Sequence, residues 1–96
     1  MVLNYKHVDI EVLGPIEKIV MLMLIKNKSM SFNDIFEKVR QVMSVTGKTY
    51  NKSNLSNTIK SLERKGFIFR ERFKNGSIIK LNESINYYAN GKRLNN

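Results

Sequence analysis

Apolar residues recur at helical spacing in three stretches of the chain: 14–28, 32–45 and 50–65. The first stretch opens on Gly14-Pro15 and is apolar almost all round, which predicts the most buried helix. The second follows Ser31, which is able to cap it. The apolar positions of the second helix are Ile35, Val39, Val42 and Met43. Those of the third helix are Leu55, Ile59 and Leu62. We expect these helices to form the core.

A β-hairpin is predicted after the third helix. Residues 67–74 and 77–81 alternate between apolar and polar side chains, and Asn75-Gly76 lies between them. Asn-Gly is a strong hairpin signal because both residues tolerate the positive φ of a type I′ turn. That turn fixes the expected register, which places Phe73 opposite Ile78, Arg72 opposite Ile79, Glu71 opposite Lys80 and Arg70 opposite Leu81.

The two ends of the chain predict weaker elements. Residues 4–12 alternate between apolar and polar, which predicts a short extended segment. The last residues place Ile85, Tyr88 and Ala89 at helical spacing, which predicts a short C-terminal helix. We expect an N-terminal arm, one domain and a C-terminal helix or tail that takes part in dimerisation, with the boundaries 1–13, 14–82 and 83–96. The expected fold class is mainly α with a small β wing, an α+β arrangement.

Composition excludes several classes of protein. The chain has 96 residues, of which 42% are apolar and 26% charged, as is typical of a single soluble domain. No apolar run reaches the roughly 20 residues that a membrane span needs. The chain has no Cys and one His, and no glycine-rich phosphate loop, metal-ligand spacing or nucleophile–base pair. We therefore expect a cytoplasmic protein with no enzyme activity, cofactor, metal site, membrane partner or small-molecule ligand.

Positive charge is concentrated in the second half of the chain. Residues 1–47 hold 6 Lys and Arg against 5 acidic residues, whereas residues 48–96 hold 11 against 3. This asymmetry indicates one surface that faces a polyanion. The alternative is a lysine-rich surface that interacts only with solvent.

The third predicted helix is polar over most of its circumference. Opposite its apolar seam lie Ser53, Asn57, Lys60 and Arg64. A helix with a thin apolar seam and a broad face of Ser, Asn, Lys and Arg is suited to contact a polar partner. The alternative is ordinary solvent-exposed surface.

The chain that follows this face resembles a known family. Residues 62–68 (Leu-Glu-Arg-Lys-Gly-Phe-Ile) resemble the passage from recognition helix to wing in winged helix-turn-helix DNA-binding proteins, especially MarR-like and PadR-like regulators and small archaeal, plasmid and viral versions. Residues 79–82 (Ile-Lys-Leu-Asn) resemble the strand that returns from the wing. The resemblance covers roughly residues 14–90. It implies a winged helix-turn-helix fold with helix 50–65 in the major groove and hairpin 70–80 on the adjacent minor groove or backbone.

The predicted DNA contacts follow from side-chain chemistry. Asn57 is suited to pair with adenine, and Lys60 or Arg64 with guanine. Phosphate contacts are expected near the start of the helix, where free N–H groups also favour anions. The full predicted set is Lys48, Tyr50, Lys52, Ser53, Asn54, Ser56, Asn57, Lys60, Arg64, Arg70, Arg72, Lys74 and Asn75. We expect Phe69 and Phe73 to brace the hairpin rather than to stack on bases.

Together these features predict a sequence-specific double-stranded DNA-binding protein that acts as a homodimeric transcriptional regulator. The dimer is expected because one module makes a small footprint on DNA, and because both chain ends carry surplus apolar residues, namely Leu3, Tyr5, Val8, Ile10, Val12, Ile85, Tyr87, Tyr88 and Leu94. One alternative is a plasmid-partition (centromere-binding) or viral protein that coats DNA and spreads along it. Another is a winged-helix module that binds protein. Either DNA-binding function implies association with the nucleoid.

Overall fold

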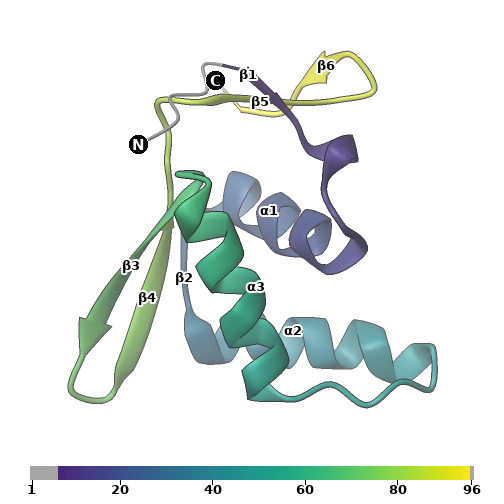
Figure 1. Cartoon of the computed structure of the whole chain (residues 1–96), viewed down its shortest axis with the longest axis vertical. Helices are drawn as coiled ribbons and strands as arrows, with labels where there is room; N and C mark the ends of the chain where they lie inside the picture. Colours follow the sequence, from purple (N-terminus) through teal and green to yellow (C-terminus); the bar gives the residue numbers. More distant parts are fainter. Residues whose placement is uncertain (1–6, 96) are drawn as a thin grey trace.

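The computed structural model describes residues 7–95, which form an α+β structure (Figure 1). The helices are α1 (Pro15–Asn27), α2 (Phe32–Val45) and α3 (Lys52–Arg64), with a short 3-10 helix, η1 (Ile10–Val12), before them. The strands are β1 (His7–Asp9), β2 (Ser29–Ser31), β3 (Ile68–Phe73), β4 (Gly76–Leu81), β5 (Asn86–Ala89) and β6 (Lys92–Arg93). None of the helices in this part of the chain has the length and apolar character needed to cross a bilayer.

The three predicted helices are confirmed, and their starts have clear local causes. The hydroxyl of Ser31 accepts a hydrogen bond from the Asp34 N–H (3.1 Å) and caps α2. The side chain of Asn51 accepts from the Asn54 N–H (2.9 Å) and caps α3. The third helix therefore begins at Lys52, and Tyr50 precedes it rather than forming its first residue.

The core lies between the three helices and the sheet. The predicted seam of α3 is confirmed, since Leu55, Ile59 and Leu62 have exposed fractions of 0%. The predicted inward stripe of α2 is only partly correct, because Ile35 and Val39 are buried whereas Val42 is exposed. In Figure 1 the C-terminal end of α2 extends past α1, which leaves this end of its stripe uncovered.

Strands β2, β4 and β3 form an antiparallel sheet with β4 at its centre. The predicted hairpin is present, but its predicted register is wrong by two residues along β4. Phe73 pairs with Gly76 and Glu71 with Ile78, so Lys74-Asn75 forms the turn. Gly76 alone takes positive φ here (145°), while Lys74 and Asn75 do not, and the predicted type I′ turn is therefore absent.

The predicted C-terminal helix is wrong, because residues 86–93 form a second hairpin. Its turn is Asn90-Gly91, and both residues have positive φ (53° and 78°), as a type I′ turn requires. Strand β5 pairs in parallel with β1, which brings the first and last parts of the described chain together. The prediction failed because tertiary packing at Tyr87 overrides the helical spacing of this segment. The Tyr87 ring is fully buried, and its hydroxyl lies within hydrogen-bond distance of the carbonyl oxygens of Asn82 (2.9 Å) and Phe67 (3.1 Å).

Formation of the second sheet also buries several of the apolar residues near the two ends of the chain. Val8, Ile10, Ile85 and Tyr87 are all buried in the same core as the helices. These four are among the nine apolar residues on which the expected dimer interface rests, and they are not available for one, whereas Val12 is 81% exposed. The predicted arm is in fact strand β1 followed by η1, while Leu3 and Tyr5 lie outside the described residues.

Candidate nucleic-acid interface

Helix α3 presents its predicted polar face to solvent. The side chains opposite the buried seam are exposed: Lys52, Ser53, Asn54, Asn57, Lys60 and Arg64. Ser56 lies closer to the core and is half-buried. Since the buried seam anchors one side of the helix, its polar side is held in place without being covered by the rest of the described chain.

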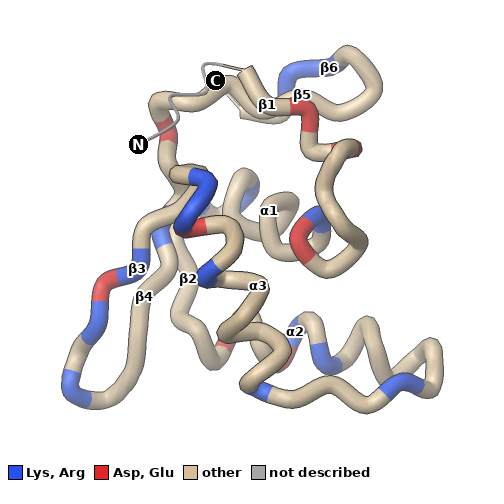
Figure 2. Tube along the Cα trace, in the orientation of Figure 1, with Lys and Arg blue, Asp and Glu red and all other residues tan. Residues whose placement is uncertain are grey.

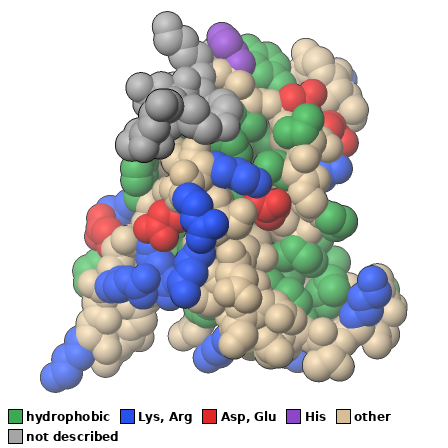
Figure 3. Space-filling view, in the orientation of Figure 1, with side chains coloured by type: hydrophobic (Ala, Val, Ile, Leu, Met, Phe, Trp, Pro, Cys, Tyr) green, Lys and Arg blue, Asp and Glu red, His purple; other side chains and the backbone are tan. Residues whose placement is uncertain are grey.

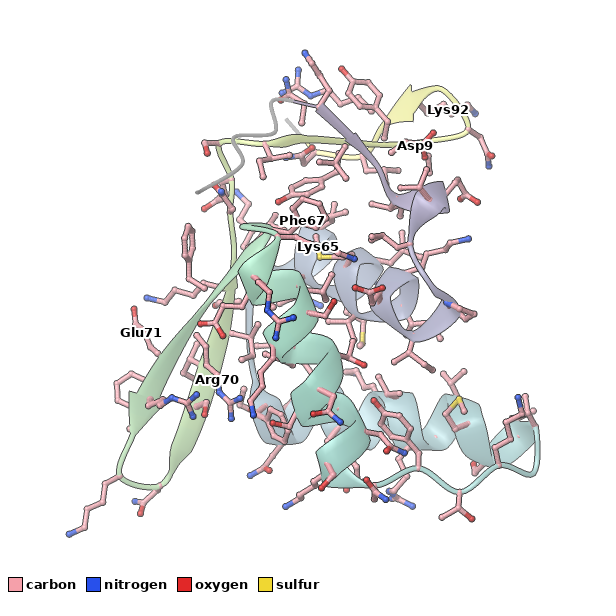
Figure 4. All side chains as sticks on the ribbon, in the orientation of Figure 1. Asp9, Lys65, Phe67, Arg70, Glu71 and Lys92 are labelled. Atoms are coloured by element: carbon pink, nitrogen blue, oxygen red, sulfur yellow. The ribbon has the colours of Figure 1, made fainter. Side chains whose placement is uncertain are left out.

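The β3–β4 hairpin lies beside α3 and has two different faces. Residues alternate between the faces of a strand, so Arg70 and Arg72 share one face with the buried Ile68, Ile79 and Leu81. We call this the inner face, and it is turned toward α3. The outer face carries Phe69, Glu71, Phe73, Ile78 and Lys80. Figure 4 shows Arg70 and Glu71 on opposite sides of the hairpin.

Arg70 is held in position on the inner face. Its Nε donates a hydrogen bond to the Ser77 hydroxyl (3.1 Å), and its guanidinium lies 5.0 Å from the centre of the Phe32 ring. Partial burial and the neighbouring charge of Arg72 lower the pKa of Arg70, while Glu63 on α3 opposes the shift. Arginine stays charged at neutral pH, so two like charges are kept close together on this face. An anion bound there would relieve their repulsion.

A hollow of about 350 Å³ separates the hairpin from the start of α2. The start of α2 and the residue before it line this hollow, together with one residue of α3 and six of the hairpin: Ser31, Phe32, Asn33, Lys52, Arg70, Phe73, Asn75, Gly76, Ser77 and Ile78. Residues from both predicted contact elements therefore meet around one cavity. Two of them, Lys52 and Arg70, are cations.

The predicted contact cations form no ion pairs in the described chain, although Glu63 on α3 acts electrostatically on Arg70, and Lys52 acts on Glu37. Ion pairs are formed by five other cations: Lys18, Lys28, Arg40, Lys65 and Lys80. None is formed by the predicted contact residues Lys48, Lys52, Lys60, Arg64, Arg70, Arg72 and Lys74 within residues 7–95. Figures 2 and 3 show Lys and Arg gathered along α3 and the hairpin. The positive charge of this surface is thus largely uncancelled.

Two predicted contact residues lie away from the open surface. Tyr50 is half-buried, and its ring stacks on Phe36 (6.1 Å between centres). Burial raises the pKa of this phenol, and the nearby Thr58 hydroxyl opposes the shift. Lys48 lies beside the C-terminal end of α2, where its N–H donates to the Met43 carbonyl (3.2 Å). That end of α2 is far from the hairpin in Figure 1.

Sequence reasoning missed the group that ties α3 to α1. A carboxylate oxygen of Glu17 accepts hydrogen bonds from Lys65 Nζ (3.0 Å) and the Ser61 hydroxyl (3.2 Å), and its side chain is only 19% exposed. Burial raises the pKa of Glu17, but Lys65 and Ser61, together with the Gly14 backbone, outweigh it, so the pKa lies below its usual value. Glu17 is the only acidic residue of α1, and this is the sequence signal that could have indicated its role.

The two hairpin phenylalanines do not pack as expected. Phe69 is 53% exposed and Phe73 58% exposed, both on the outer face. They do not brace the hairpin against the core, because the buried Ile68, Ile79 and Leu81 on the other face do so.

Within residues 7–95, no three His, Asp or Glu side chains gather so that they could hold a metal ion. Comparison of the chain with protein-family models, with curated proteins and with solved structures found no match.

Proposed function

We propose that this protein binds double-stranded DNA as a winged-helix protein and acts as a transcriptional regulator. In this proposal α3 lies in the major groove, and the β3–β4 hairpin contacts the adjacent minor groove or backbone. The observation that carries it is the combination, in α3, of a fully buried apolar seam with an open face of Ser, Asn, Lys and Arg. The order of elements, three helices followed by a hairpin, is consistent with it.

The dimensions of DNA agree with this arrangement. The major groove is about 12 Å wide and admits one helix, whose side chains then reach the base edges. On the exposed face of α3, Asn57 has an amide that is suited to pair with adenine, and Lys60 and Arg64 are suited to guanine. These residues would determine which sequence is bound.

Contacts to phosphate would supply most of the affinity. The candidates are Lys52 and Ser53 at the start of α3, and Arg70, Arg72 and Lys74 on the hairpin beside it. A surface that contacts six to ten phosphates loses about 10³- to 10⁵-fold in affinity between roughly 50 and 200 mM salt. A steep salt dependence is therefore expected.

A protein-binding module is the weaker alternative. A helix that binds protein through its exposed face needs apolar side chains there, whereas the exposed residues of α3 are all polar or charged. A protein that coats DNA uses the same surface as a regulator, and the two differ in whether binding spreads along the duplex.

The test is a binding assay on a pool of random duplexes at several salt concentrations. Asn57→Ala is expected to relax base preference at a cost of ~1–3 kcal/mol, whereas Arg72→Ala weakens binding to all sequences and lowers the salt slope by about 1. Lys92→Ala is the matched control, since it removes one positive charge from strand β6 at the far end of the molecule (Figure 4). Wild-type affinity in both test variants would contradict the proposed surface.

A further inference from the structure

The outer face of the hairpin leaves two large aromatic side chains in solvent. Phe69 (53% exposed) and Phe73 (58% exposed) lie on the same face of β3, with Glu71 between them. The paired strand adds Ile78, which is half-buried. Exposed aromatic residues grouped on one face indicate a contact surface.

Charge on this face is cancelled locally. Glu71 and Lys80 form an ion pair across the hairpin, between the two phenylalanines. At the other end of the sheet, Lys28 pairs with Glu83 (3.3 Å). The strand positions of the outer face thus hold no unpaired cation among the described residues, which disfavours contact with a phosphate backbone.

A second copy of this chain is the occupant that the charges favour. The protein carries a net charge of +9, so two copies repel each other wherever their basic surfaces meet. The outer face is apolar and neutral, and it is turned away from α3. Two outer faces related by a two-fold axis would present the same surface to each other, which is the arrangement of a symmetric pair.

The size of the face limits how stable such a pair can be. A fully buried aromatic residue removes about 150–250 Å² from water. The exposed halves of two phenylalanines therefore supply on the order of 200 Å² per copy, against the roughly 800 Å² per partner of a stable interface. The contact is too small to hold two free copies together. It is sufficient for copies already bound to one duplex, where their effective concentration is high.

We propose that the outer face of the β3–β4 hairpin joins two copies bound side by side on the same duplex and makes their binding cooperative. This inference rests on the proposed DNA-binding function. In the pair, the two hairpins meet at the centre and the two α3 helices lie outside them, so the half-sites are inverted. A two-fold contact is satisfied by two copies, so cooperativity ends at the pair and does not spread.

The experiment compares a duplex of about one helical turn, which holds one copy, with a duplex of about three turns, which holds two. Wild-type protein is expected to sediment as a monomer when free and to bind the longer duplex pairwise, with a cooperativity factor of about 10. The double variant Phe69→Ser/Phe73→Ser is expected to bind the longer duplex without cooperativity. Its affinity for the short duplex is expected to change less than about twofold.

Two further variants separate this contact from other causes. Val45→Ser is the matched control, because Val45 is 87% exposed at the end of α2 and its removal is expected to leave cooperativity intact. Glu71→Lys adds positive charge to the outer face and is expected to abolish cooperativity without weakening binding to the short duplex. This variant keeps the proposal falsifiable if the double variant fails to fold.

The outcomes distinguish this inference from the function on which it rests. Failure of the wild-type protein to bind any duplex would overturn the proposed function. Binding to the short duplex without cooperativity on the longer one would overturn only the inference. So would a double variant that loses affinity for the short duplex or for a single strand, because the phenylalanines would then contact nucleic acid. A free dimer that survives the double substitution would also overturn it.

Discussion

The two faces of the β3–β4 hairpin differ in how their exposed groups are paired. On the inner face, Arg70 and Arg72 are close like charges without an acidic ion-pair partner in the described chain. On the outer face, Glu71 and Lys80 pair with each other and leave Phe69 and Phe73 as the exposed groups. A single strand thus presents charge to one side and aromatic surface to the other. This difference is the basis of the two proposals, in which a polyanion binds on the inner side and a second copy of the chain on the outer side.

The largest expected effect is a loss of folding stability when a buried core residue of the hairpin sheet is truncated. Ile79 is fully buried at the centre of the sheet, so Ile79→Ala should lower the free energy of unfolding by about 2–5 kcal/mol. Urea denaturation measures this loss. The neighbouring Ile78 is half-buried on the outer face, and Ile78→Ala should cost less than half as much. Equal losses would show that the outer face is as well packed as the inner one.

The next effect tests whether only the inner face contacts DNA. Arg70→Ala removes a charged donor that the Ser77 hydroxyl and the Phe32 ring hold in place, and it should weaken duplex binding by about 1.5–3 kcal/mol. Phe69→Ala, one residue earlier on the outer face, should leave binding to a single-copy duplex unchanged. Fluorescence anisotropy with a labelled short duplex compares the two variants. Similar losses in both would remove the distinction between the faces.

The smallest expected effect is on folding stability, when the Glu17–Lys65 ion pair that joins α1 to the end of α3 is removed. Because folding lowers the pKa of Glu17, its ion pair with Lys65 stabilises the native state near neutral pH, and this contribution disappears as the pH falls through the lowered value. Glu17→Gln should therefore lower stability by less than about 1 kcal/mol at pH 7. Its difference from wild type should shrink as the pH falls below about 4.3, the ordinary pKa of a glutamate, and should vanish at an acidic pH below the lowered value.

Thermal unfolding at the two pH values measures this difference. Glu71→Gln is the control, since it removes a carboxylate from an exposed pair on the outer face. A deficit of Glu17→Gln that persists in acid would mean that the carboxylate acts through packing rather than through charge.

Local pattern was sufficient to predict the helices and the polar face of α3. The spacing of Leu55, Ile59 and Leu62 repeats within single turns, and a helix with one apolar seam has only one way to turn toward a core. The exposed position of Asn57 and Lys60 follows from that seam. In the hairpin, strand alternation puts Phe69 and Arg70 on opposite faces.

Pairing between distant segments was not predictable in this way. The chain contains two Asn-Gly pairs, and the sequence pattern favoured the type I′ turn at Asn75-Gly76, whereas both positive φ values occur at Asn90-Gly91. Which of the two Asn-Gly pairs forms a type I′ turn depends on contacts between residues far apart in the sequence. Tyr87 is drawn into the core between Phe67 and Asn82, and β5 pairs with β1 from the other end of the chain.

The sequence by itself determined the three helices, the existence of a hairpin and the excess of positive charge in the second half, because each depends on residues close together along the chain. Tertiary structure alone decided the hairpin register, the second sheet and the exposure of Phe69 and Phe73. The second sheet depends on pairing between segments far apart in the chain, and the exposure of the phenylalanines depends on which face of the hairpin the core covers. Here the face with Ile68, Ile79 and Leu81 is the buried one, and Phe69 and Phe73 on the opposite face stay exposed.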